Sequence, residues 1–253
     1  MTFGISIPFE RIRHSGTDAS VFPFFRAGVA KRRPRRASGR LHVRGIALRE
    51  PSALLLAAKR TIDIAGAGCG LLVFAPLFIA IAVAIKLTSR GPVFFKQKRY
   101  GYHNRRFWIY KFRTMYIHLG DSRGTTQTTA NDPRITPLGR ILRKSSLDEL
   151  PQLINVFKGD MSLVGPRPHV PGMLAGGMLY EELTPYYFQR HNMHPGITGL
   201  AQVSGYRGST AAPLSAIERL DRDLRYIETW SLWQDVSIIA RTAVREFTKG
   251  SGD

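Results

Sequence analysis

The longest uncharged segment of the chain runs from Ile64 to Ile85, and its 22 residues read IAGAGCGLLVFAPLFIAIAVAI. As one straight helix it would be about 33 Å long at 1.5 Å per residue, enough for a bilayer core of about 30 Å. A helix that is apolar all round lies either in the core of a large protein or in a membrane. The pattern therefore predicts insertion into a membrane.

The segments on both sides of this run are basic, over residues 31–60 and 86–106. The positive-inside rule places excess Lys and Arg in the cytoplasm, and a single span cannot keep both flanks there, whereas a hairpin can. Pro76 lies near the middle of the run and breaks or kinks a helix, which favours a re-entrant helix-break-helix. The alternative is a kinked spanning helix, because membrane helices tolerate proline.

Gly66, Gly68 and Gly70 lie at alternate positions inside this apolar segment. Their spacing resembles part of a nucleotide-binding fingerprint, but small residues in an apolar helix favour close packing against a neighbour. We expect the second role.

The pattern changes after the membrane segment. Residues 92–100 (PVFFKQKRY) and 105–115 (RRFWIYKFRTM) are rich in aromatic and β-branched residues, and the turn at 101–104 predicts a β-hairpin. Residues 119–133 are polar and rich in Thr and in helix-breaking residues such as Gly, Asp and Pro, which predicts a mobile loop. Helices are expected around 147–154 and 217–227.

The last periodic segment, WSLWQDVSIIARTAVREF, predicts an amphipathic helix. Its apolar positions recur every three or four residues: Leu232, Val236, Ile239, Ala243 and Phe247. Trp230 and Trp233 begin it, and tryptophan prefers the membrane interface. The helix therefore lies on the bilayer or packs against the domain core, and the pattern alone does not decide between them.

Charge adds a second constraint, since Lys and Arg total 37 against 18 Asp and Glu, a formal charge of +19. Such a surface attracts anionic lipid, phosphate-rich substrates or nucleic acid. Residues 1–50 are expected to form a basic and flexible arm that either adheres to the anionic inner leaflet or is simply solvated. A single cysteine, Cys69, excludes an internal disulfide and a Cys-based metal cage, and the first 25 residues hold no secretory signal.

The chemistry is concentrated in residues 145–168 (SSLDELPQLINVFKGDMSLVGPRP). Asp148 and Glu149 are adjacent carboxylates. Ser146 and Glu149 also fit a capping box, which is the structural alternative for the pair. Both interpretations place them at a helix start, where the dipole favours ionisation, and an ionised aspartate acts as a nucleophile or a metal ligand.

Arg167 lies between two prolines that hold it extended, and a fixed guanidinium suits a phosphate; the alternative is an ordinary turn with an exposed arginine. Further cations accompany it along the chain: Lys111, Arg113, Arg134, Arg140 and Arg143. Carboxylates beside fixed cations suit phosphoryl transfer assisted by Mg²⁺.

Two other classes of function explain part of this pattern. A membrane-associated nucleic-acid or scaffold protein would account for the charge, although it would need neither the apolar run nor the carboxylate pair. A diphosphate hydrolase would use the same cations. No GxxxxGK[ST], GxSxG or HExxH motif is present, which argues against the enzyme classes that those motifs mark.

Taken in order, several segments resemble the bacterial sugar transferases, the monotopic polyprenyl-phosphate phosphoglycosyl transferases. The resemblance runs from about Lys59 to Phe247 and includes KRTIDIAG, SRGPVFFKQKRYG, YKFRTM, DPRITPLGRILRKSSLDELPQLINVFKGDMSLVGPRP, HPGITGLAQVSGYRG and DLRYIETWSLWQDV. The segment PGITGLAQVSGYRG resembles the short, exopolysaccharide-priming members.

The resemblance implies a mostly helical α/β monotopic membrane protein. Its parts would be the arm at 1–50, a re-entrant membrane helix at 51–90 broken at Pro76, and a catalytic domain at 91–253 with a small β-hairpin and amphipathic interfacial helices. It further implies that Asp148 is the nucleophile and that Glu149, with Asp148, binds Mg²⁺. Arg167 would bind phosphate, and Lys111, Arg143 and Asp223 match other substrate-binding positions.

The implied reaction transfers a sugar-1-phosphate from a UDP-sugar to undecaprenyl phosphate through a phosphosugar-aspartyl intermediate and releases UMP. Glucose or galactose is the expected sugar, in the first membrane step of exopolysaccharide or capsule synthesis. The resemblance places the enzyme on the cytoplasmic face of the bacterial inner membrane, without a nucleic-acid partner. It leaves open a homodimer, the exact sugar and the uridine-binding residues.

Overall fold

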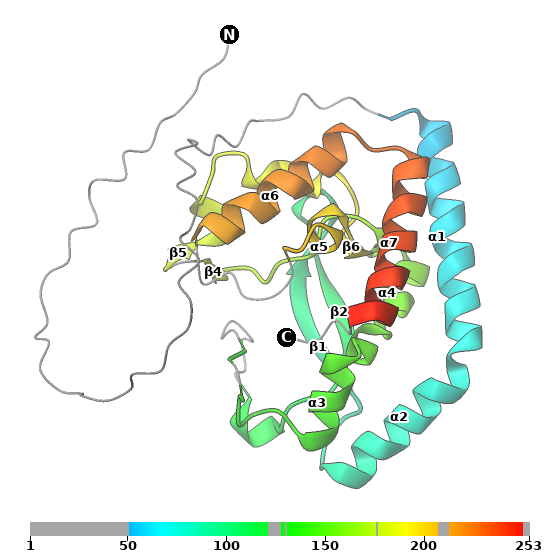
Figure 1. Ribbon diagram of the computed structural model, residues 1–253, viewed down its shortest axis with the longest axis vertical. Helices are drawn as coiled ribbons and strands as arrows, with labels where there is room; N and C mark the ends of the chain where they lie inside the picture. The colour runs from blue at the N-terminus through cyan, green and yellow to red at the C-terminus, as the bar shows by residue number, and fades with distance from the viewer. Residues whose placement is uncertain (1–50, 121–127, 130, 176, 207–212, 250–253) are drawn as a thin grey trace, which may run out of the picture. The chain divides into compact units, whose positions relative to one another are not determined.

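The computed structural model describes residues 51–120, 128–129, 131–175, 177–206 and 213–249 of the chain (Figure 1). The arm at 1–50 and most of the loop expected at 119–133 therefore lie outside the described residues. The longer elements are α1 (Ala53–Val73), α2 (Ala75–Thr88), β1 (Phe94–Tyr100), β2 (Arg106–Phe112), α3 (Pro137–Lys144), α4 (Gln152–Lys158), α6 (Pro213–Glu228) and α7 (Leu232–Lys249). The protein is thus mixed in secondary structure and mostly helical, as expected.

The apolar segment forms two helices rather than one. The break falls at Phe74, and Pro76 lies in the first turn of α2, where its missing N–H leaves no hydrogen bond unmade. The expected break is therefore present, two residues before the proline, because the proline ring clashes with the carbonyl four residues back. No single described helix is both long and apolar enough to cross a bilayer, but α1 and α2 together satisfy that test and meet at a bend of 60°.

The polarity of α1 is inverted relative to a helix on the surface of a soluble protein. Its buried positions are Lys59, Asp63 and Ala67, at four-residue spacing. Many of its large apolar side chains are exposed instead: Leu54, Leu55, Leu56, Ile62, Ile64, Leu72 and Val73. Helix α2 exposes Ile79, Val83 and Leu87 in the same way. The pair therefore presents a wide apolar surface outward.

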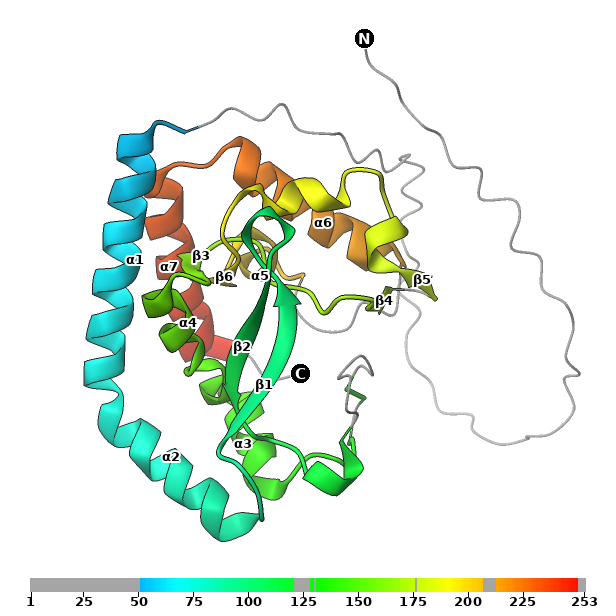
Figure 2. The same ribbon diagram turned by 180° about the vertical axis from the view of Figure 1, so that it is seen from behind.

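The three glycines of α1 allow close packing, as predicted. A Cβ at Gly66 would lie 2.7 Å from Leu163 Cδ1, and one at Gly70 would lie 3.1 Å from Leu153 Cδ1. Helix α4 consequently runs beside α1 (Figures 1 and 2). Ala67, Leu153, Val156 and Met161 share one hydrophobic cluster with Ile109 of β2.

The hairpin predicted at 92–115 is confirmed. Strands β1 and β2 pair antiparallel, with Phe95 opposite Lys111 and Tyr100 opposite Arg106. Phe112, at the end of β2, enters a second cluster with Ile81 and Ile85 of α2 and Leu142 of α3. The hairpin thus connects the bent helix pair to the segment that carries the carboxylates.

Two shorter sheets were not expected from the sequence. Strand β3 (Ser162–Val164) pairs in parallel with β6 (Gly196–Thr198), and β4 (Leu174–Ala175) pairs with β5 (Met178–Leu179). Hydrogen bonds from Gly165 N to Thr198 O and from Gly196 N to Pro166 O extend the first pair toward Arg167. The close approach of the two segments needs glycine, because a Cβ at Gly165 would lie 2.3 Å from the carbonyl oxygen of His194.

Helix α7 packs on the protein through a narrow face. Ile238 joins a cluster with Val164, Met193 and Tyr226, and Asp235 is buried, where Lys59 Nζ donates to it at 2.6 Å. Trp233, Val236, Ile239 and Val244 are exposed, while the side chain of Phe247 lies outside the described residues. Of the apolar positions expected to share one face, Val236 and Ile239 thus point away from the core.

Gly139→Ala should destabilise the protein, because a Cβ there would lie 2.1 Å from Thr114 O, a backbone atom that cannot turn aside. We expect a loss of about 1–3 kcal/mol in the free energy of unfolding, measured as a lower thermal midpoint in one detergent. Gly68→Ala is the matched control, since its Cβ would make an ordinary contact with Phe157 at 3.5 Å and alanine favours a helix by about 1 kcal/mol. Equal midpoints for the two variants would contradict the assigned contact.

Candidate active site

The two carboxylates lie on a short 3-10 helix, Leu147–Glu149, that follows α3. Ser146 precedes it in the left-handed conformation (φ 55°), and its side chain makes no capping hydrogen bond to this turn. The capping-box interpretation is therefore wrong. The left-handed residue turns the chain sharply, so that Asp148 and Glu149 both become buried instead of capping a helix at the surface.

Glu149 is held by two cations from different elements. Arg167 makes a bidentate contact with it, in which Nη2 donates to Oε1 at 2.5 Å and Nη1 donates to Oε2 at 3.1 Å. Lys111 Nζ of β2 donates to the same Oε1 at 2.6 Å. Burial disfavours the charged carboxylate, but these two cations outweigh it and hold the pKa of Glu149 well below its ordinary value. Glu149 is therefore a fixed anion.

Asp148 is in a different electrostatic state. Burial raises the pKa of its carboxyl above the ordinary value, and the neighbouring Glu149 charge raises it further. Lys111 opposes this at 3.9 Å from Oδ2, a longer distance than its contact with Glu149. The helix dipole expected to favour ionisation is thus not the main influence on Asp148, since a three-residue 3-10 turn has little dipole and burial is the largest cause of the raised pKa.

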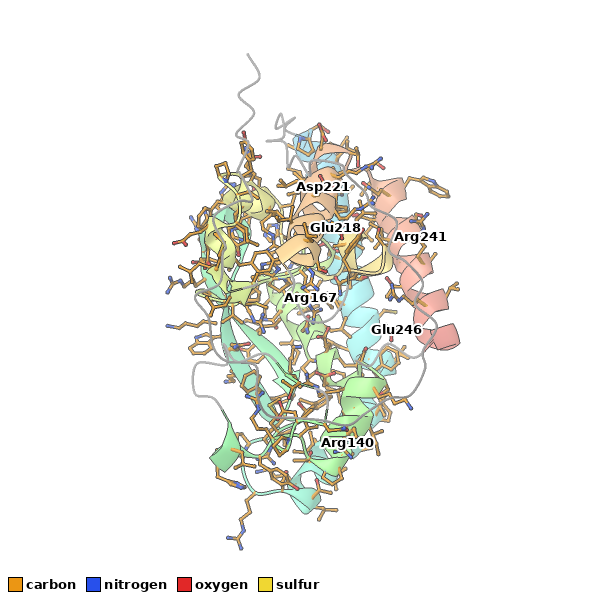
Figure 3. All side chains as sticks on the ribbon, turned by 60° about the vertical axis from the view of Figure 1, so that its left-hand side comes forward. Arg140, Arg167, Glu218, Asp221, Arg241 and Glu246 are labelled. Carbon is orange, nitrogen blue, oxygen red and sulfur yellow. The ribbon has the colours of Figure 1, made fainter. Side chains whose placement is uncertain are left out.

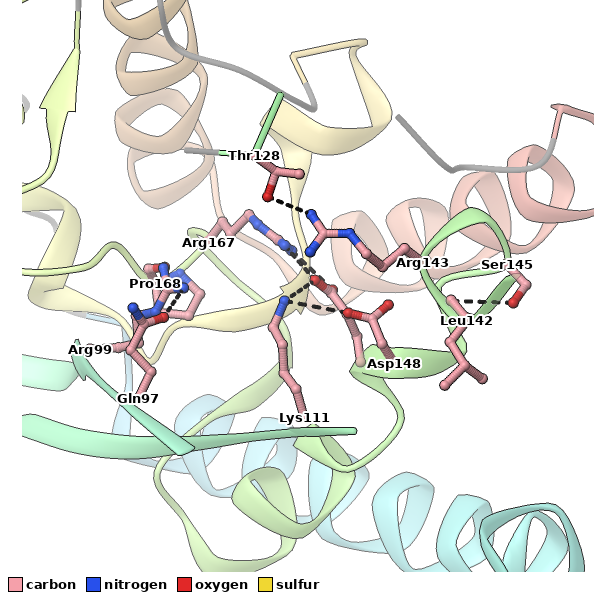
Figure 4. A network of polar contacts seen from close by, with 11 residues as sticks. Gln97, Arg99, Lys111, Thr128, Leu142, Arg143, Ser145, Asp148, Arg167 and Pro168 are labelled. Atoms are coloured by element: carbon pink, nitrogen blue, oxygen red, sulfur yellow. Dashed lines mark hydrogen bonds and ion pairs between the residues drawn. The ribbon is translucent and has the colours of Figure 1, made fainter. Parts of the chain in front are cut away.

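Figure 4 shows Lys111, Arg143 and Arg167 pointing toward the carboxylates from β2, α3 and the loop after β3. Arg143 Nη2 donates to Thr128 Oγ1 at 2.9 Å, and its charge lowers the pKa of Asp148. The structure therefore brings five of the six predicted site residues together. Three cations surround two carboxylates, and this excess of positive charge suits a diphosphate.

The loop that carries Arg167 is fixed by two arginines, the buried Arg190 and the partly buried Arg99. Arg190 Nη2 donates to the carbonyl oxygen of Arg167 at 2.6 Å, and Arg99 Nη1 donates to that of Pro168 at 3.1 Å. Burial and the nearby Arg167 lower the pKa of Arg99 to about 10. The rigid, extended loop expected from its prolines is therefore reinforced by hydrogen bonds to its backbone.

Asp223 is the sixth predicted site residue, and its side chain is only 1% exposed. Its Oδ2 accepts a hydrogen bond from Arg190 Nη2 at 2.5 Å, and Arg190 in turn holds the backbone of Arg167. A buried carboxylate committed to an arginine is poorly placed to bind a phosphate. This geometry favours a positioning role for Asp223 instead of the substrate contact that we expected.

The other cations in the predicted cluster serve different purposes. Arg113 caps the C-terminal end of α2, donating to the carbonyl oxygens of Arg90 and Ser89 at 2.5 and 2.7 Å. Arg134 pairs with Asp132 at 2.6 Å, which holds the pKa of that carboxyl below its ordinary value through the hydrogen bond and the nearby charge. Arg140 is exposed and lies far from Arg167 in Figure 3.

Sequence reasoning missed Arg190, Arg99 and the role of HPGITG. Arg190 and Asp223 are 33 positions apart, and no periodic pattern connects them. The glycines of GPRP and HPGITG were the available signal, because two glycine-containing segments can approach each other closely. Their pairing places Arg167 beside the dyad.

The donors present suit Mg²⁺ in one of its usual binding modes. No group of three or more His, Cys, Asp or Glu side chains that could hold a metal occurs in the part of the chain that the structure describes. Mg²⁺ commonly binds through one or two carboxylates, with substrate phosphates and water completing the shell. Asp148 fits that pattern, and Glu149 would bind the ion with oxygens that it shares with Arg167 and Lys111; the substrate itself would supply further ligands.

A sequence model of the bacterial sugar transferase family matches residues 54–249, which is most of the chain. The exopolysaccharide production protein PSS of Rhizobium leguminosarum bv. phaseoli is 52% identical over 197 residues, or 78% of this chain and 98% of that protein. The motifs that indicated the resemblance therefore belong to an alignment that covers nearly the whole relative.

Two longer relatives are named for their chemistry. The undecaprenyl-phosphate glucose phosphotransferase of Komagataeibacter xylinus is 49% identical over 74% of this chain, and the alignment spans 35% of that protein. The UDP-glucose:undecaprenyl-phosphate glucose-1-phosphate transferase of Escherichia coli (strain K12) is 46% identical over 75% of this chain, and the alignment spans 40% of that protein. The chain therefore belongs to the bacterial sugar transferase family, and it is a transferase enzyme.

Proposed function

We propose that this enzyme transfers a sugar-1-phosphate from a UDP-sugar to undecaprenyl phosphate and releases UMP, through a covalent intermediate on Asp148. The observation that carries the proposal is the asymmetry of the two carboxylates. Glu149 has both oxygens engaged by Arg167 and Lys111, whereas the nearest cation to Asp148 among the described residues is Lys111, at 3.9 Å. The less engaged carboxylate is the one able to form a new bond.

The proposed reaction has two balanced steps. An Oδ atom of ionised Asp148 attacks the phosphorus that carries the sugar, the bond from that phosphorus to the bridging oxygen breaks, and UMP leaves with the bonding electrons. An oxygen of undecaprenyl phosphate then attacks the same phosphorus. The Asp148–phosphorus bond breaks, the carboxylate is restored, and the product is an undecaprenyl diphosphate sugar. Covalent catalysis divides one difficult transfer into two easier steps.

The surrounding cations give this chemistry its electrostatic support. Arg167, Lys111 and Arg143 face the carboxylates, and fixed positive charge offsets the charge that develops on a transferring phosphoryl group. Asp148 and Glu149 would also hold Mg²⁺, which neutralises diphosphate charge when bound. Arg190 and Asp223 keep Arg167 in place without contacting substrate in this scheme.

The relatives guide the choice of substrate. The names of the K. xylinus and E. coli relatives specify glucose and undecaprenyl phosphate, and that of the R. leguminosarum relative specifies exopolysaccharide production. We propose UDP-glucose as the first donor to test, UDP-galactose as the second, and the first membrane step of exopolysaccharide synthesis as the role.

We also propose that α1 and α2 form a re-entrant hairpin on the cytoplasmic face of the inner membrane. The exposed apolar side chains of the pair, its 60° bend and the basic flanks support this. The exposed Trp233, Val236 and Ile239 of α7 would rest at the interface beside it.

Asp148→Asn should abolish sustained UMP release, because an amide cannot form the phosphosugar intermediate. Purified protein in nanodiscs, given Mg²⁺, UDP-glucose or UDP-galactose and undecaprenyl phosphate, should lose about 10³-fold or more in rate. Asp221→Asn is the matched control, since Asp221 lies on α6 and is labelled away from Arg167 in Figure 3. Activity that survives in Asp148→Asn would exclude Asp148 as the nucleophile.

The rate of the first step should rise with pH through the pKa of Asp148, because only the ionised carboxylate attacks. Burial raises that pKa and Lys111 lowers it, so Lys111→Gln should move the acidic limb of the pH–rate profile to higher pH. The measurement is single-turnover UMP formation at saturating UDP-sugar. A limb that stays in place, or moves to lower pH, would show that Lys111 does not act on Asp148 in this way.

The hairpin can be tested with single cysteines in a Cys69→Ser background. Ala53→Cys and Thr88→Cys lie at the outer ends of α1 and α2. In a hairpin both ends face the cytoplasm, so a membrane-impermeant maleimide added to spheroplasts should label neither cysteine. Labelling of either one would indicate a spanning helix. Pro76→Leu should favour one continuous helix, so it should make one of the two ends reactive; detergent-solubilised protein controls for intrinsic reactivity.

A further inference from the structure

A cavity of about 310 Å³ lies on the apolar side of the catalytic turn. It is enclosed by α1, the turn that carries the dyad, the segment after β6, and α7. Its described lining residues are Gly66, Gly70, Phe74, Ser146, Glu149, Leu150, Leu153, Ile197, Thr198, Gln202, Val203, Thr242, Arg245 and Glu246. This volume falls in the range of about 300–1,000 Å³ typical of small-molecule sites.

The cavity meets the cation cluster at Glu149, and none of the three cations Lys111, Arg143 and Arg167 lines it. Glu149 belongs to both, since its carboxylate is held by Lys111 and Arg167 while the residue also lines the cavity. Leu150, Leu153, Ile197 and Val203 give the cavity apolar walls. A uridine diphosphate is polar and charged, so these walls suit a different ligand.

The position of the cavity identifies the kind of ligand that it fits. One wall is formed by Gly66, Gly70 and Phe74 of α1, the helix whose outer face is apolar and exposed. Phe74 is the residue at which α1 bends into α2. An apolar chain that passes Phe74 would thus run from the catalytic turn to the apolar surface of the helix pair.

We propose that this cavity binds the acceptor lipid, with the proximal isoprene units of its prenyl chain between α1, α5 (Leu200–Val203) and α7 and its phosphate near Glu149 and Arg245. The inference rests on the proposed function and adds the acceptor's place in the site. The donor would approach from the side of Arg143, Arg167 and Lys111. The two substrates would therefore meet Asp148 from opposite sides of the turn.

Small residues on α1 create the space. Gly66 and Gly70 lie one turn apart and both line the cavity, and a side chain at either position would enter the gap between α1 and its neighbours. The glycines thus bring α1 close to Leu163 and Leu153, and the cavity lies beside these contacts.

Arg245 is the only cation among the described residues that line the cavity. Its Nη1 donates to the carbonyl oxygen of Gln202 at 2.8 Å, which orients the guanidinium from the last turns of α7. An arginine fixed in this way offers its remaining N–H groups to a phosphate. Its charge would attract the acceptor headgroup to this end of a cavity that also holds the carboxylates of Glu149 and Glu246.

Two substitutions separate acceptor binding from the rest of the reaction. Val203→Phe fills part of the cavity, and Arg245→Gln removes its cation. Each should raise the KM for undecaprenyl phosphate about tenfold or more. Single-turnover UMP formation without lipid should stay within about twofold of wild type, since the donor side is untouched. An unchanged KM, or an equal loss in both steps, would overturn the assignment.

Matched controls exclude general effects of charge or size. Arg241→Gln removes the same charge from the exposed face of α7 one turn away (Figure 3), and Val236→Phe makes the same change of side chain at an exposed position of α7 outside the lining. Both should keep the wild-type KM for the lipid. A rise in KM for Arg241→Gln equal to that for Arg245→Gln would attribute the effect to the membrane surface and overturn the role of Arg245.

A binding readout keeps this inference distinct from the proposed function. An undecaprenyl phosphate analogue with a diazirine on a proximal isoprene unit should crosslink to residues 66–74, 197–203 or 242–246 in nanodiscs, and Val203→Phe should reduce the yield. Crosslinks elsewhere, with UMP and lipid product still formed, would overturn the cavity and leave the function intact. Crosslinks at these residues without UMP from any UDP-sugar would support the cavity and contradict the function.

Discussion

The site depends on one buried carboxylate, Glu149, and the two cations that neutralise it. A buried carboxylate costs several kcal/mol unless it is paired, and Lys111 and Arg167 pair with it at 2.5–2.6 Å. The three residues belong to a hairpin strand, a 3-10 turn and a loop, so their ion pairs fix the positions of these three segments relative to one another. Because Glu149 takes up these cations, the adjacent Asp148 keeps its oxygens available, while burial and the charge of Glu149 raise its pKa.

The supports of this centre are also buried and charged. Asp223 holds Arg190, which holds the backbone of Arg167, while Lys59 of α1 donates to Asp235 of α7 and to the carbonyl oxygen of Val164, at the end of the strand that leads to that loop. Helix α1 thus turns polar residues toward the protein and leucines away from it. In the proposed membrane setting, one helix would fix both the depth of the enzyme in the bilayer and the position of its phosphate-binding arginine.

Much of this architecture was predictable from local sequence patterns. The apolar run predicted the bent helix pair, the strand-like segments at 92–115 predicted the hairpin, and the three- to four-residue repeat of apolar positions at the end predicted α7. Each of these elements depends on residues that are close together in the sequence. The resemblance added Asp148, Glu149, Lys111, Arg143 and Arg167. The β3–β6 pair, the Arg190–Asp223 pair and the cavity depend on contacts between segments far apart in the sequence. A repeating pattern of apolar positions carries no information about such contacts. The capping box predicted for Ser146 and Glu149 does not form, because Glu149 is engaged in ion pairs with Lys111 and Arg167 instead.

The central claim is that Asp148 carries the sugar phosphate between donor and acceptor. The most direct test is intact-protein mass spectrometry after a rapid acid quench, with UDP-glucose, UDP-galactose and Mg²⁺ present and lipid absent. The account predicts an adduct with the mass of one hexose phosphate, located by peptide mapping to Asp148 and lost when undecaprenyl phosphate is added before the quench. Lipid product formed without any such adduct, or with the adduct on another residue, would contradict it.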